Sequence, residues 1–470
     1  MKQGEYNMKI SIIGAGSIRF SLQLIGDMAK TKSTSDSHVS IMDINEEKLN
    51  AIYLLAQKYA NELNSGLRFE KTTDLSLALD SADFVINTAA PCLYPDHYEK
   101  INQVGEKHGY YRGIDSREFN MVSTYNYALC SYYDLKFTLN LAQSMEKLCP
   151  NAWLLQTANP VFEITQVVSK LTNTNIVGFC HGFSGVFEVF RSLKLNPKEV
   201  DWQVAGVNHG IWLNRFLYQG KNAYPMLDRW IEEESQSWEP KNPWDVQFSP
   251  AVIDMYKFYG LLPIGDTCRN GTWKYNFNLN TKKNWYGKFG GIDNEIERPK
   301  FHQELFDKKQ KLFELAKMVE GDPQLNLTQV YPEIFMKEKM SGEQHIPFIN
   351  AINKNCDTRL ILNAQNFGAI PNIPDDVVVE IPIVVNQKGF TREKLEPDLT
   401  DRIKTMYLMP RVLQMKSALE AFSSKDKKVL EEILIRDART SSYEQVKAVL
   451  DEIMSLPFNR EIAEYFSYQV

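Results

Sequence analysis

The segment Met8-Lys9-Ile10-Ser11-Ile12-Ile13-Gly14-Ala15-Gly16-Ser17 decides the fold that we predict for this chain. Its first six residues are nearly all apolar and predict a buried strand, and apolar residues from Ile18 to Met28 follow at spacings compatible with a helix. A strand, a tight glycine turn and a helix N-terminus form a cradle for a pyrophosphate, because the backbone approaches closely and the helix dipole favours negative charge. A third glycine is absent near Arg19 and Phe20, so the dinucleotide fingerprint is partial.

A second predicted strand, His38–Met42, ends at a carboxylate, Asp43. An acid at this position can accept hydrogen bonds from the ribose hydroxyls of adenosine, which favours NAD over NADP. An unrelated α/β domain with a tight turn is the alternative. We predict that the cofactor contacts the glycine turn, the start of its helix and the neighbouring strand ends, at Gly14, Gly16, Ser17, Ile18, Arg19, Asp43 and Thr88.

Strands and helices continue to alternate along the first half of the chain. Helices are predicted over Glu46–Leu63 and Tyr125–Leu148, and strands over Ala82–Asn87, Ala152–Gln156 and Asn175–Val177. This alternation indicates a doubly wound parallel sheet, whose ligands bind at the carboxyl ends of the strands. Five residues with binding potential fall at such ends, namely Gly14, Asp43, Thr88, Asn159 and Cys180.

Two short groups of reactive side chains lie between residues 176 and 210. They are Gly178-Phe179-Cys180-His181-Gly182-Phe183 and Val207-Asn208-His209-Gly210. A thiol and an imidazole flanked by glycines can bind one cation from two sides and leave other positions open for substrate oxygens. A cysteine in a core and a hydrogen-bonded histidine are the structural alternatives.

Two further places in the sequence have both a structural and a functional interpretation. The segment Glu106–Glu118 is dense in charge and aromatic residues, and it is either a surface loop or a lid over a sugar with Arg112 and Asp115 as hydrogen-bonding groups. Asp266 follows an apolar run and Gly265, so that it either caps the next helix or acts in catalysis.

The second half of the chain predicts a mixture of helices and paired strands. The run Ser341-Gly342-Glu343-Gln344 fits a capping box before a helix over Ile346–Ile352. Strands over Leu360–Asn363 and Val377–Val385 are predicted to pair, and helices over about Thr400–Phe422 and Lys427–Ile435 close the chain. We therefore predict a Rossmann-type domain at residues 8–205 and an α+β catalytic domain at residues 206–470.

Length and charge narrow the class of protein. A chain of 470 residues suits two packed domains. A net charge of -6, with Lys and Arg dispersed, argues against a nucleic-acid partner. No apolar run reaches the roughly 18 residues that span a bilayer, so no membrane association is expected. Six scattered cysteines show no disulfide pattern, and together with the lack of a signal peptide they favour a cytoplasmic location.

Five motifs together resemble the NAD- and metal-dependent glycoside hydrolases of family 4, over essentially the whole chain. They are Gly14-Ala15-Gly16-Ser17, Gln156-Thr157-Ala158-Asn159-Pro160, Cys180-His181-Gly182-Phe183, Val207-Asn208-His209-Gly210 and Pro263-Ile264-Gly265-Asp266-Thr267. The resemblance implies a fold like that of lactate and malate dehydrogenases in the first half. It also implies a homodimer or homotetramer. The Cys-His-Gly form looks like the branch that acts on α-glucuronides or α-galacturonides.

The chemistry that the resemblance implies is a transient oxidation of the sugar. NAD takes a hydride from the third carbon, a divalent metal (Mn²⁺ by resemblance) stabilises the enediolate formed when a base removes the proton of the second carbon, and the aglycone then leaves. Water adds and the hydride returns, so the net reaction is hydrolysis. A thiolate and an imidazole would by softness prefer zinc or cobalt, so the choice of manganese comes from the resemblance.

Roles carried over from the resemblance fall on named residues. The metal ligands are Cys180 and His209, and Asp266 matches the base of the α-glucosidase-like members. Asn159 is expected to contact substrate hydroxyls, and His181 or Asp115 to contact the sugar or protonate the leaving oxygen.

The identity of the glycone depends on the side chains that would bind it. A uronate substrate needs a cationic partner, for which Arg112 and Arg269 are the candidates. An α-glucuronide is the expected substrate, and an α-galacturonide and an α-glucoside are alternatives. A 2-hydroxy-acid dehydrogenase, which would share the first domain, and an NAD-sensing regulator are the rival classes.

Overall fold

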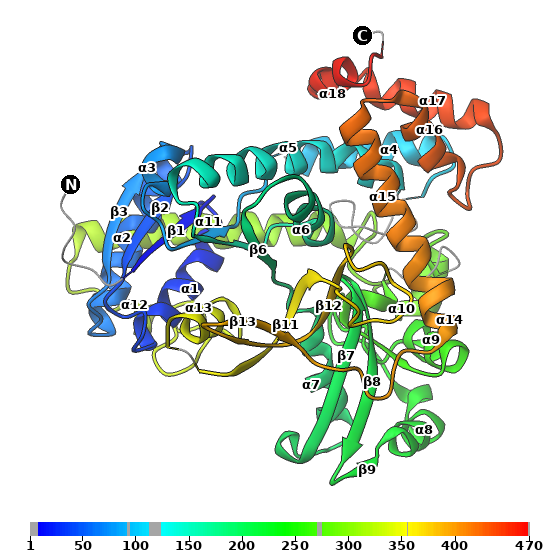
Figure 1. Ribbon diagram of the computed structural model, residues 1–470, viewed down its shortest axis with the longest axis horizontal. Coiled ribbons are helices and arrows are strands. Elements are labelled where there is room, and N and C mark those ends of the chain that lie inside the picture. Colours follow the sequence, from blue (N-terminus) through cyan, green and yellow to red (C-terminus); the bar gives the residue numbers. More distant parts are fainter. Residues whose placement is uncertain (1–7, 92–94, 112–123, 270–274, 355, 469–470) are drawn as a thin grey trace.

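The backbone is organised around one mixed β-sheet. The computed structural model describes residues 8–91, 95–111, 124–269, 275–354 and 356–468. Within them the sheet has 13 strands in the order β10-β8-β7-β12-β11-β6-β5-β4-β1-β2-β3, with β13 beside β12 and β9 beside β8. The sheet runs from the N-terminal half at the left of Figure 1 to the β7–β8 hairpin at the lower right.

The parallel half of the sheet consists of β1 (Lys9–Ile13), β2 (His38–Met42), β3 (Arg68–Thr72), β4 (Phe84–Asn87), β5 (Trp153–Gln156) and β6 (Asn175–Gly178). These six strands are parallel and lie in the order 3-2-1-4-5-6, which is that of the Rossmann sheet. The predicted fold class is therefore confirmed. The prediction omitted β3 because its sequence, RFEKT, is polar and its side chains are only partly covered at the edge of the sheet.

Helices of the first half pack in two groups, as a doubly wound sheet requires. They are α1 (Ile18–Lys30), α2 (Glu46–Glu62), α3 (Leu75–Leu79), α4 (Pro95–Lys107), α5 (Thr124–Leu148) and α6 (Val161–Leu171). The helix α1 packs against α2, whereas α3 and α6 pack against α5. The N-terminus of α2 is fixed by Asn45, whose side chain accepts a hydrogen bond from the backbone N–H of Lys48.

The antiparallel half extends the same sheet beyond β6. It contains β7 (Val200–Val207), β8 (Gly210–Tyr218), β9 (Lys221–Asn222), β10 (Leu262–Ile264), β11 (Thr358–Gln365), β12 (Val378–Asn386) and β13 (Gly389–Arg392). The predicted pairing of the strands near 360 and 380 is confirmed by the long β11–β12 ladder. The β11–β6 and β12–β7 junctions are short, with Asn363 opposite Gly178 and Glu380 opposite Gly206. Two buried polar residues thus stand where the two halves of the sheet meet.

The remaining helices surround this second half. They are α7 (Gly185–Ser192), α8 (Tyr224–Glu233), α9 (Pro250–Tyr259), α10 (Leu279–Tyr286), α11 (Glu297–Gly321), α12 (Leu327–Val330), α13 (His345–Lys354), α14 (Asp401–Ile403), α15 (Met409–Ser424), α16 (Lys427–Ile435), α17 (Tyr443–Met454) and α18 (Arg460–Tyr465). A π-helical turn, Lys404–Leu408, joins α14 to α15, so the predicted helix from Thr400 is confirmed with one irregular turn. The predicted helix Lys427–Ile435 is α16.

A second apolar core lies among the C-terminal helices, at the upper right of Figure 1. It combines residues from α4 and α15 to α18, among them Ile101, Leu430, Val446 and Ile462. The C-terminal helices are therefore packed against the N-terminal half of the chain.

The predicted domain border and the predicted capping box have different outcomes. The predicted domain border between 205 and 206 falls inside β7, so the division into two domains stays a prediction. The capping box predicted at Ser341–Gln344 is wrong, because the Ser341 hydroxyl accepts from the backbone N–H of Glu343 and donates to Asp27 instead. The side chain of Gln344 binds the backbone of Ile361 at 2.7 Å.

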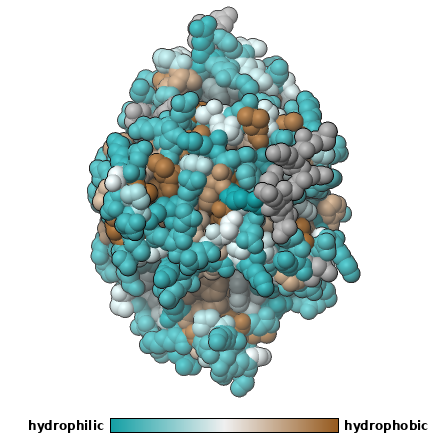
Figure 2. Space-filling model, turned by 90° about the vertical axis from the view of Figure 1, so that its left-hand side faces the viewer, coloured by the Kyte–Doolittle hydropathy of each residue, from teal (hydrophilic) through white to brown (hydrophobic). Residues whose placement is uncertain are grey.

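The surface at the end that carries α2, β3 and α12 is mostly hydrophilic (Figure 2). Small hydrophobic areas interrupt it, as is normal for a protein surface in water. Among the described residues, no helix combines the length and the apolar character that crossing a bilayer demands.

Candidate active site

The glycine turn between β1 and α1 is closed by tight backbone contacts. The backbone N–H groups of Gly14 and Ala15 both donate to the carbonyl of Met42 at 3.0 Å. Gly14 has a φ of +78°, and a Cβ atom built on it would lie 2.4 Å from the Cα of Ala89. Only glycine fits at this position, because a side chain would meet both strain and backbone atoms.

The predicted adenosine partner, Asp43, lies directly against this turn. One carboxylate oxygen accepts from the backbone N–H of Gly16 at 2.7 Å, and the other from that of Asn45 at 2.9 Å. The hydroxyl of Thr88 donates to the carbonyl of Gly14 at 2.9 Å. Strand ends β1, β2 and β4 therefore bring four of the predicted cofactor residues together.

The other predicted cofactor residues lie at the start of α1. Ser17 and Arg19 are exposed, and the side chain of Ile18 is buried in the core. A cofactor can therefore reach Ile18 only through its backbone. At the end of β5, half-buried Asn159 lies three residues beyond Gln156.

A thiol and an imidazole meet at the carboxyl end of β6. Cys180 follows this strand, and His209 lies in the two-residue connection between β7 and β8. The side chains of Cys180 and His209 are in hydrogen-bond contact. Burial, and next to it the charge of Glu380, raise the pKa of the Cys180 thiol, whereas His209 opposes this rise.

The backbone conformation of His209 is unusual, and hydrogen bonds from a distant helix stabilise it. Its φ is +55°, a value that few residues other than glycine adopt. Two N–H groups of the buried Arg411 donate to the carbonyls of His209 and Asn208, at 2.7 and 2.9 Å. The helix α15 thereby fixes the turn that presents the imidazole, and strain at such a position is typical of functional sites.

Asp266 lies next to this pair, in a 3₁₀ turn, Gly265–Cys268, after β10. One carboxylate oxygen is 3.5 Å from Nε2 of His209, and the other accepts a hydrogen bond from Arg269. Burial opposes ionisation of Asp266, but Arg269 and then His209 outweigh it and hold the pKa of the carboxyl well below its usual range. The carboxylate of Asp266 therefore pairs with the guanidinium of Arg269, and among the described helices it caps none.

Arg269 is shared between two carboxylates. Besides Asp266 it binds the buried Asp293, at 3.1 Å through Nε and 2.7 Å through Nη2, and Asp293 is also bound by Arg298. The expected role of Arg269 in binding a substrate carboxylate stays a prediction. Arg112, the other candidate for this role, and Asp115, which was predicted to contact the sugar or protonate the leaving oxygen, lie outside the described residues.

His181 belongs to a chain of polar side chains that the sequence did not reveal. Its side chain is 77% exposed, and Nδ1 lies 3.6 Å from the carboxylate of Glu343. The contact with this carboxylate raises the pKa of His181. The other oxygen of Glu343 lies 3.9 Å from buried His345, whose Nε2 is 2.6 Å from the hydroxyl of Thr157.

A second residue missed from the sequence is Glu380, which is 1% exposed. It accepts from the side chains of Asn208 at 2.8 Å and Asn363 at 3.2 Å, and within the described part of the structure its other oxygen has no hydrogen-bond partner. Burial raises the pKa of Glu380. A single glutamate inside the apolar run Val377–Val385 was the available signal, since buried acids are rarely left without a role.

The donor set suits a cation that is only partly enclosed by protein. Within the described ranges no group of three or more His, Cys, Asp or Glu side chains is arranged to hold a metal. The Cys180–His209 pair is nevertheless a soft and borderline donor set of the kind that transition metals bind. A Cβ atom on Gly182 would lie 3.5 Å from the sulfur of Cys180, in van der Waals contact with it, so the glycine leaves this side of the thiol uncovered.

The fold and this edge of the sheet define an α/β protein with a Rossmann sheet and a polar cluster at its strand ends. The model of the family 4 glycosyl hydrolases matches residues 9–195, and that of the C-terminal domain of the same family matches residues 204–440. Because the two matches cover most of the chain, the protein belongs to family 4 of the glycosyl hydrolases and is a glycoside hydrolase. The family resemblance predicted from the motifs is confirmed.

Several relatives are similar over most of their length. An α-galactosidase of Bacillus subtilis (strain 168) is 23% identical over 385 residues, which cover 82% of each chain. An α-galacturonidase of Thermoanaerobacter italicus is 20% identical over 477 residues and 95% of each chain. Among solved structures, a 6-phospho-α-glucosidase from gut microorganisms in complex with NAD and Mn²⁺ has a TM-score of 0.74, is 19% identical and covers 98% of both chains. This likeness shows a shared fold.

Proposed function

We propose that this enzyme hydrolyses α-glycosides of hexuronic acids with the help of NAD and a divalent metal. The observation that carries the proposal is the cluster in which Cys180 contacts His209 and His209 lies 3.5 Å from Asp266, at the sheet edge that also carries the glycine turn. The relative named α-galacturonidase spans 95% of the chain and supports a uronide as the glycone. Galacturonides and glucuronides are both within the proposal, and a neutral α-glucoside is the second candidate.

When bound, NAD would accept and return the hydride of the third sugar carbon, and the divalent metal would polarise the neighbouring oxygens. The chain supplies the cradle for the dinucleotide, because Gly14 and Gly16 leave the backbone bare and Asp43 stands where ribose hydroxyls would be received. In the structure Asp43 is bound to the N–H of Gly16, so it would exchange this partner for the ribose.

Cys180 and His209 would hold the metal, which is Mn²⁺ in the similar 6-phospho-α-glucosidase. The hydrogen bonds from Arg411 fix the backbone of the His209 turn, and His209 itself is buried. Rigid support of this kind keeps a ligand in place without the cost of ordering it during the reaction.

Asp266 would remove the proton from the second sugar carbon. Because Arg269 and His209 lower its pKa, its carboxylate is ionised throughout the neutral range, although the same two partners make it a weaker base. Arg269 also fixes the direction of the carboxylate, and Asp293 in turn fixes Arg269. An ionised and oriented carboxylate is the form that a carbon base needs.

His181 would give a proton to the leaving oxygen. It is the most exposed polar side chain of the cluster, and Glu343 raises the pKa of the imidazole, which shifts the equilibrium toward the protonated form that can donate a proton. Glu343 would thereby act as a positioning residue for His181. Asp115 stays a second candidate for this step.

The proposed setting is a cytoplasmic homodimer or homotetramer. The described cysteines Cys149, Cys180, Cys268 and Cys356 are free thiols, which suits a reducing compartment.

The test is hydrolysis of the nitrophenyl α-glucuronide, α-galacturonide and α-glucoside, with and without NAD and Mn²⁺. The proposal expects release of nitrophenol from a uronide only when both are present, with no net NADH. Stoichiometric NADH without release of the aglycone would instead indicate a hydroxy-acid dehydrogenase.

A further inference from the structure

A pocket lies between α7 and the segment 238–248, next to the loop that carries Asp266. It has a volume of about 490 Å³. Its walls are formed by aromatic, charged and small polar side chains, namely Glu188, Arg191, Ser192, Trp238, Glu239, Lys241, Asn242, Trp244, Asp245 and Phe248.

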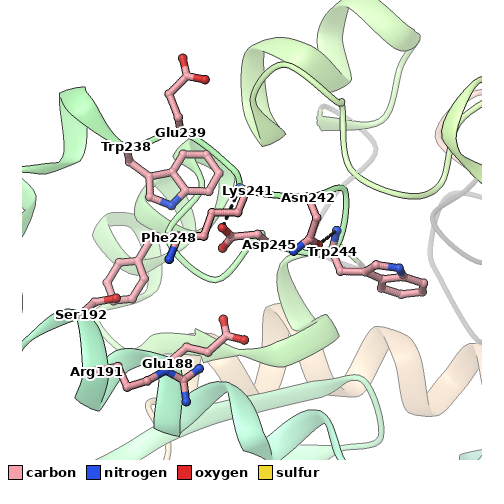
Figure 3. A pocket seen from close by; sticks show the side chains of 10 residues that line it. All are labelled: Glu188, Arg191, Ser192, Trp238, Glu239, Lys241, Asn242, Trp244, Asp245 and Phe248. Atoms are coloured by element: carbon pink, nitrogen blue, oxygen red, sulfur yellow. Dashed lines mark hydrogen bonds between the residues drawn. The ribbon is translucent and has the colours of Figure 1, made fainter. Parts of the chain in front are cut away.

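Figure 3 shows how these side chains are arranged around a central space. Trp238, Lys241, Asp245 and Phe248 lie on one side, and Glu188 with Arg191 on the other. The carboxylate of Glu239 and the indole of Trp244 point away from this space. The pocket therefore combines an indole with charged and polar side chains on opposite walls, as ligand sites do.

Charge decides which class of ligand suits the pocket. The four ionisable groups around the space are the acids Glu188 and Asp245 and the bases Arg191 and Lys241, so their formal charges cancel. Burial and then the charge of Asp245 raise the pKa of Glu188, and Arg191 and Lys241 lower it, so these four groups interact with one another. A balanced set of this kind would leave an ionic ligand without a net counter-charge. It offers a neutral polar ligand both donors and acceptors.

The elements that line the pocket pack against the loop that carries Asp266. Gly185, at the start of α7, is packed so closely that a Cβ on it would lie 2.8 Å from the backbone N of Gly265. Gln247 accepts from this N–H at 2.8 Å and donates to the carbonyl of Pro263 at 2.9 Å. Glu188 lies three residues along α7 from Gly185, a rise of about 4.5 Å.

The rim of the pocket also reaches the proposed base. The indole of Trp244 lies 5.1 Å from the guanidinium of Arg269, which binds Asp266. Two separate contacts, one through Gln247 and one through Trp244, thus join the pocket to the loop that carries Asp266.

We propose that this pocket binds a neutral pyranose, whose C–H face stacks on Trp238 and whose hydroxyl groups bind Glu188, Arg191 and Asp245. The sugar has two sources, the leaving group of a disaccharide substrate or a free monosaccharide. The inference rests on the proposed function, because the first source places a uronic acid in the active site and a neutral sugar in this pocket.

The first experiment compares two substrates of the holoenzyme with NAD and Mn²⁺. One is an α-linked disaccharide of a uronic acid and a neutral hexose, and the other is the methyl α-glycoside of the same uronic acid. Trp238→Ala is expected to lower kcat/KM for the disaccharide at least tenfold more than for the methyl glycoside. Trp238→Phe should restore most of this difference, and Glu239→Gln, whose side chain points away, should not produce it.

The second experiment measures binding of D-galactose, D-glucose and D-xylose to the same holoenzyme by isothermal titration calorimetry. A free monosaccharide is the occupant if the wild type binds one sugar per chain and Trp238→Ala loses this binding, while the substitution lowers kcat/KM equally for the two substrates. Equal effects on the two substrates together with no Trp238-dependent binding overturn the inference. A wild-type enzyme that cleaves neither glycoside contradicts the proposed function. The calorimetric measurement then still shows whether the pocket binds a neutral sugar.

Discussion

Replacing Asp266 by Asn tests the catalytic role of the carboxylate with little change in shape. The side chain is half-buried, 3.5 Å from His209, and accepts a hydrogen bond from Arg269. An amide oxygen can still accept that hydrogen bond, but it cannot take up a proton from carbon. The substitution therefore removes the basic function and leaves most of the packing.

The size of the effect follows from this geometry. A positioned base contributes about 10²- to 10⁴-fold to a rate, which corresponds to about 3–5 kcal/mol in the barrier. The loss of stability should be smaller, about 1–2 kcal/mol, because Arg269 keeps its second carboxylate, Asp293. For a chain of 470 residues this shifts Tm by only about 1–2 °C.

The assay is the incorporation of solvent deuterium at the second carbon of the sugar, followed by NMR in D₂O with NAD and Mn²⁺ present. Asp266→Asn is expected to lose incorporation and hydrolysis together while it remains folded. The matched control is Asp293→Asn, which removes the support of Arg269 and Arg298. It should lower Tm by more, about 3–5 °C, and reduce exchange much less than Asp266→Asn does, because the basic carboxylate of Asp266 is still present.

Wild-type exchange in Asp266→Asn would refute the assignment of the base. Loss of exchange in both variants, with equal loss of folded protein, would show that Asp266 acts through structure alone.

Three further outcomes are expected. Cys180→Ala should abolish metal-dependent turnover but leave NAD binding, measured by calorimetry, within about twofold, whereas Cys149→Ala, in the hydrophobic core, should lose stability and keep metal binding. Gly16→Ala should weaken NAD at least tenfold, because its Cβ would lie 2.4 Å from Oδ2 of Asp43, and unchanged NAD affinity would contradict the cradle. Burial lowers the pKa of Lys282 from 10.5 to about 8. Keeping this lysine charged in the folded protein at pH 7 therefore costs free energy, and Lys282→Met should raise the free energy of unfolding by about 1–3 kcal/mol at that pH. This gain should shrink as pH rises from 8 to 10.5 in thermal melts, and a gain that is constant with pH would exclude the ionisation as its cause.

Much of the fold could be predicted because the central strands are apolar on both faces. The run Lys9–Ile13 and its glycine turn identify the Rossmann half, since a buried parallel strand has a continuous apolar sequence. The edge strand Arg68–Thr72 has no such pattern and was missed. The long antiparallel pair was found for the same reason as the central strands, but its junctions with β6 and β7 could not be read from periodicity.

The candidate site was only partly accessible to sequence reasoning. Cys180 and His209 were singled out by their glycine neighbours and by the family resemblance, and the structure brings them into contact. Glu343 was assigned to a helix cap, because its local sequence fits a capping box that the tertiary contacts of Ser341 override. Arg411 lies on a helix that was predicted, but its burial and its contacts with the His209 turn depend on packing between distant segments.

The most direct test of the account is anomalous diffraction at the manganese edge from crystals soaked with Mn²⁺ and NAD. The account predicts one strong peak in contact with the sulfur of Cys180 and the imidazole of His209, on the side of the sheet edge where the nicotinamide lies. A peak bound elsewhere, or none at that pair in fully NAD-loaded crystals, would contradict it.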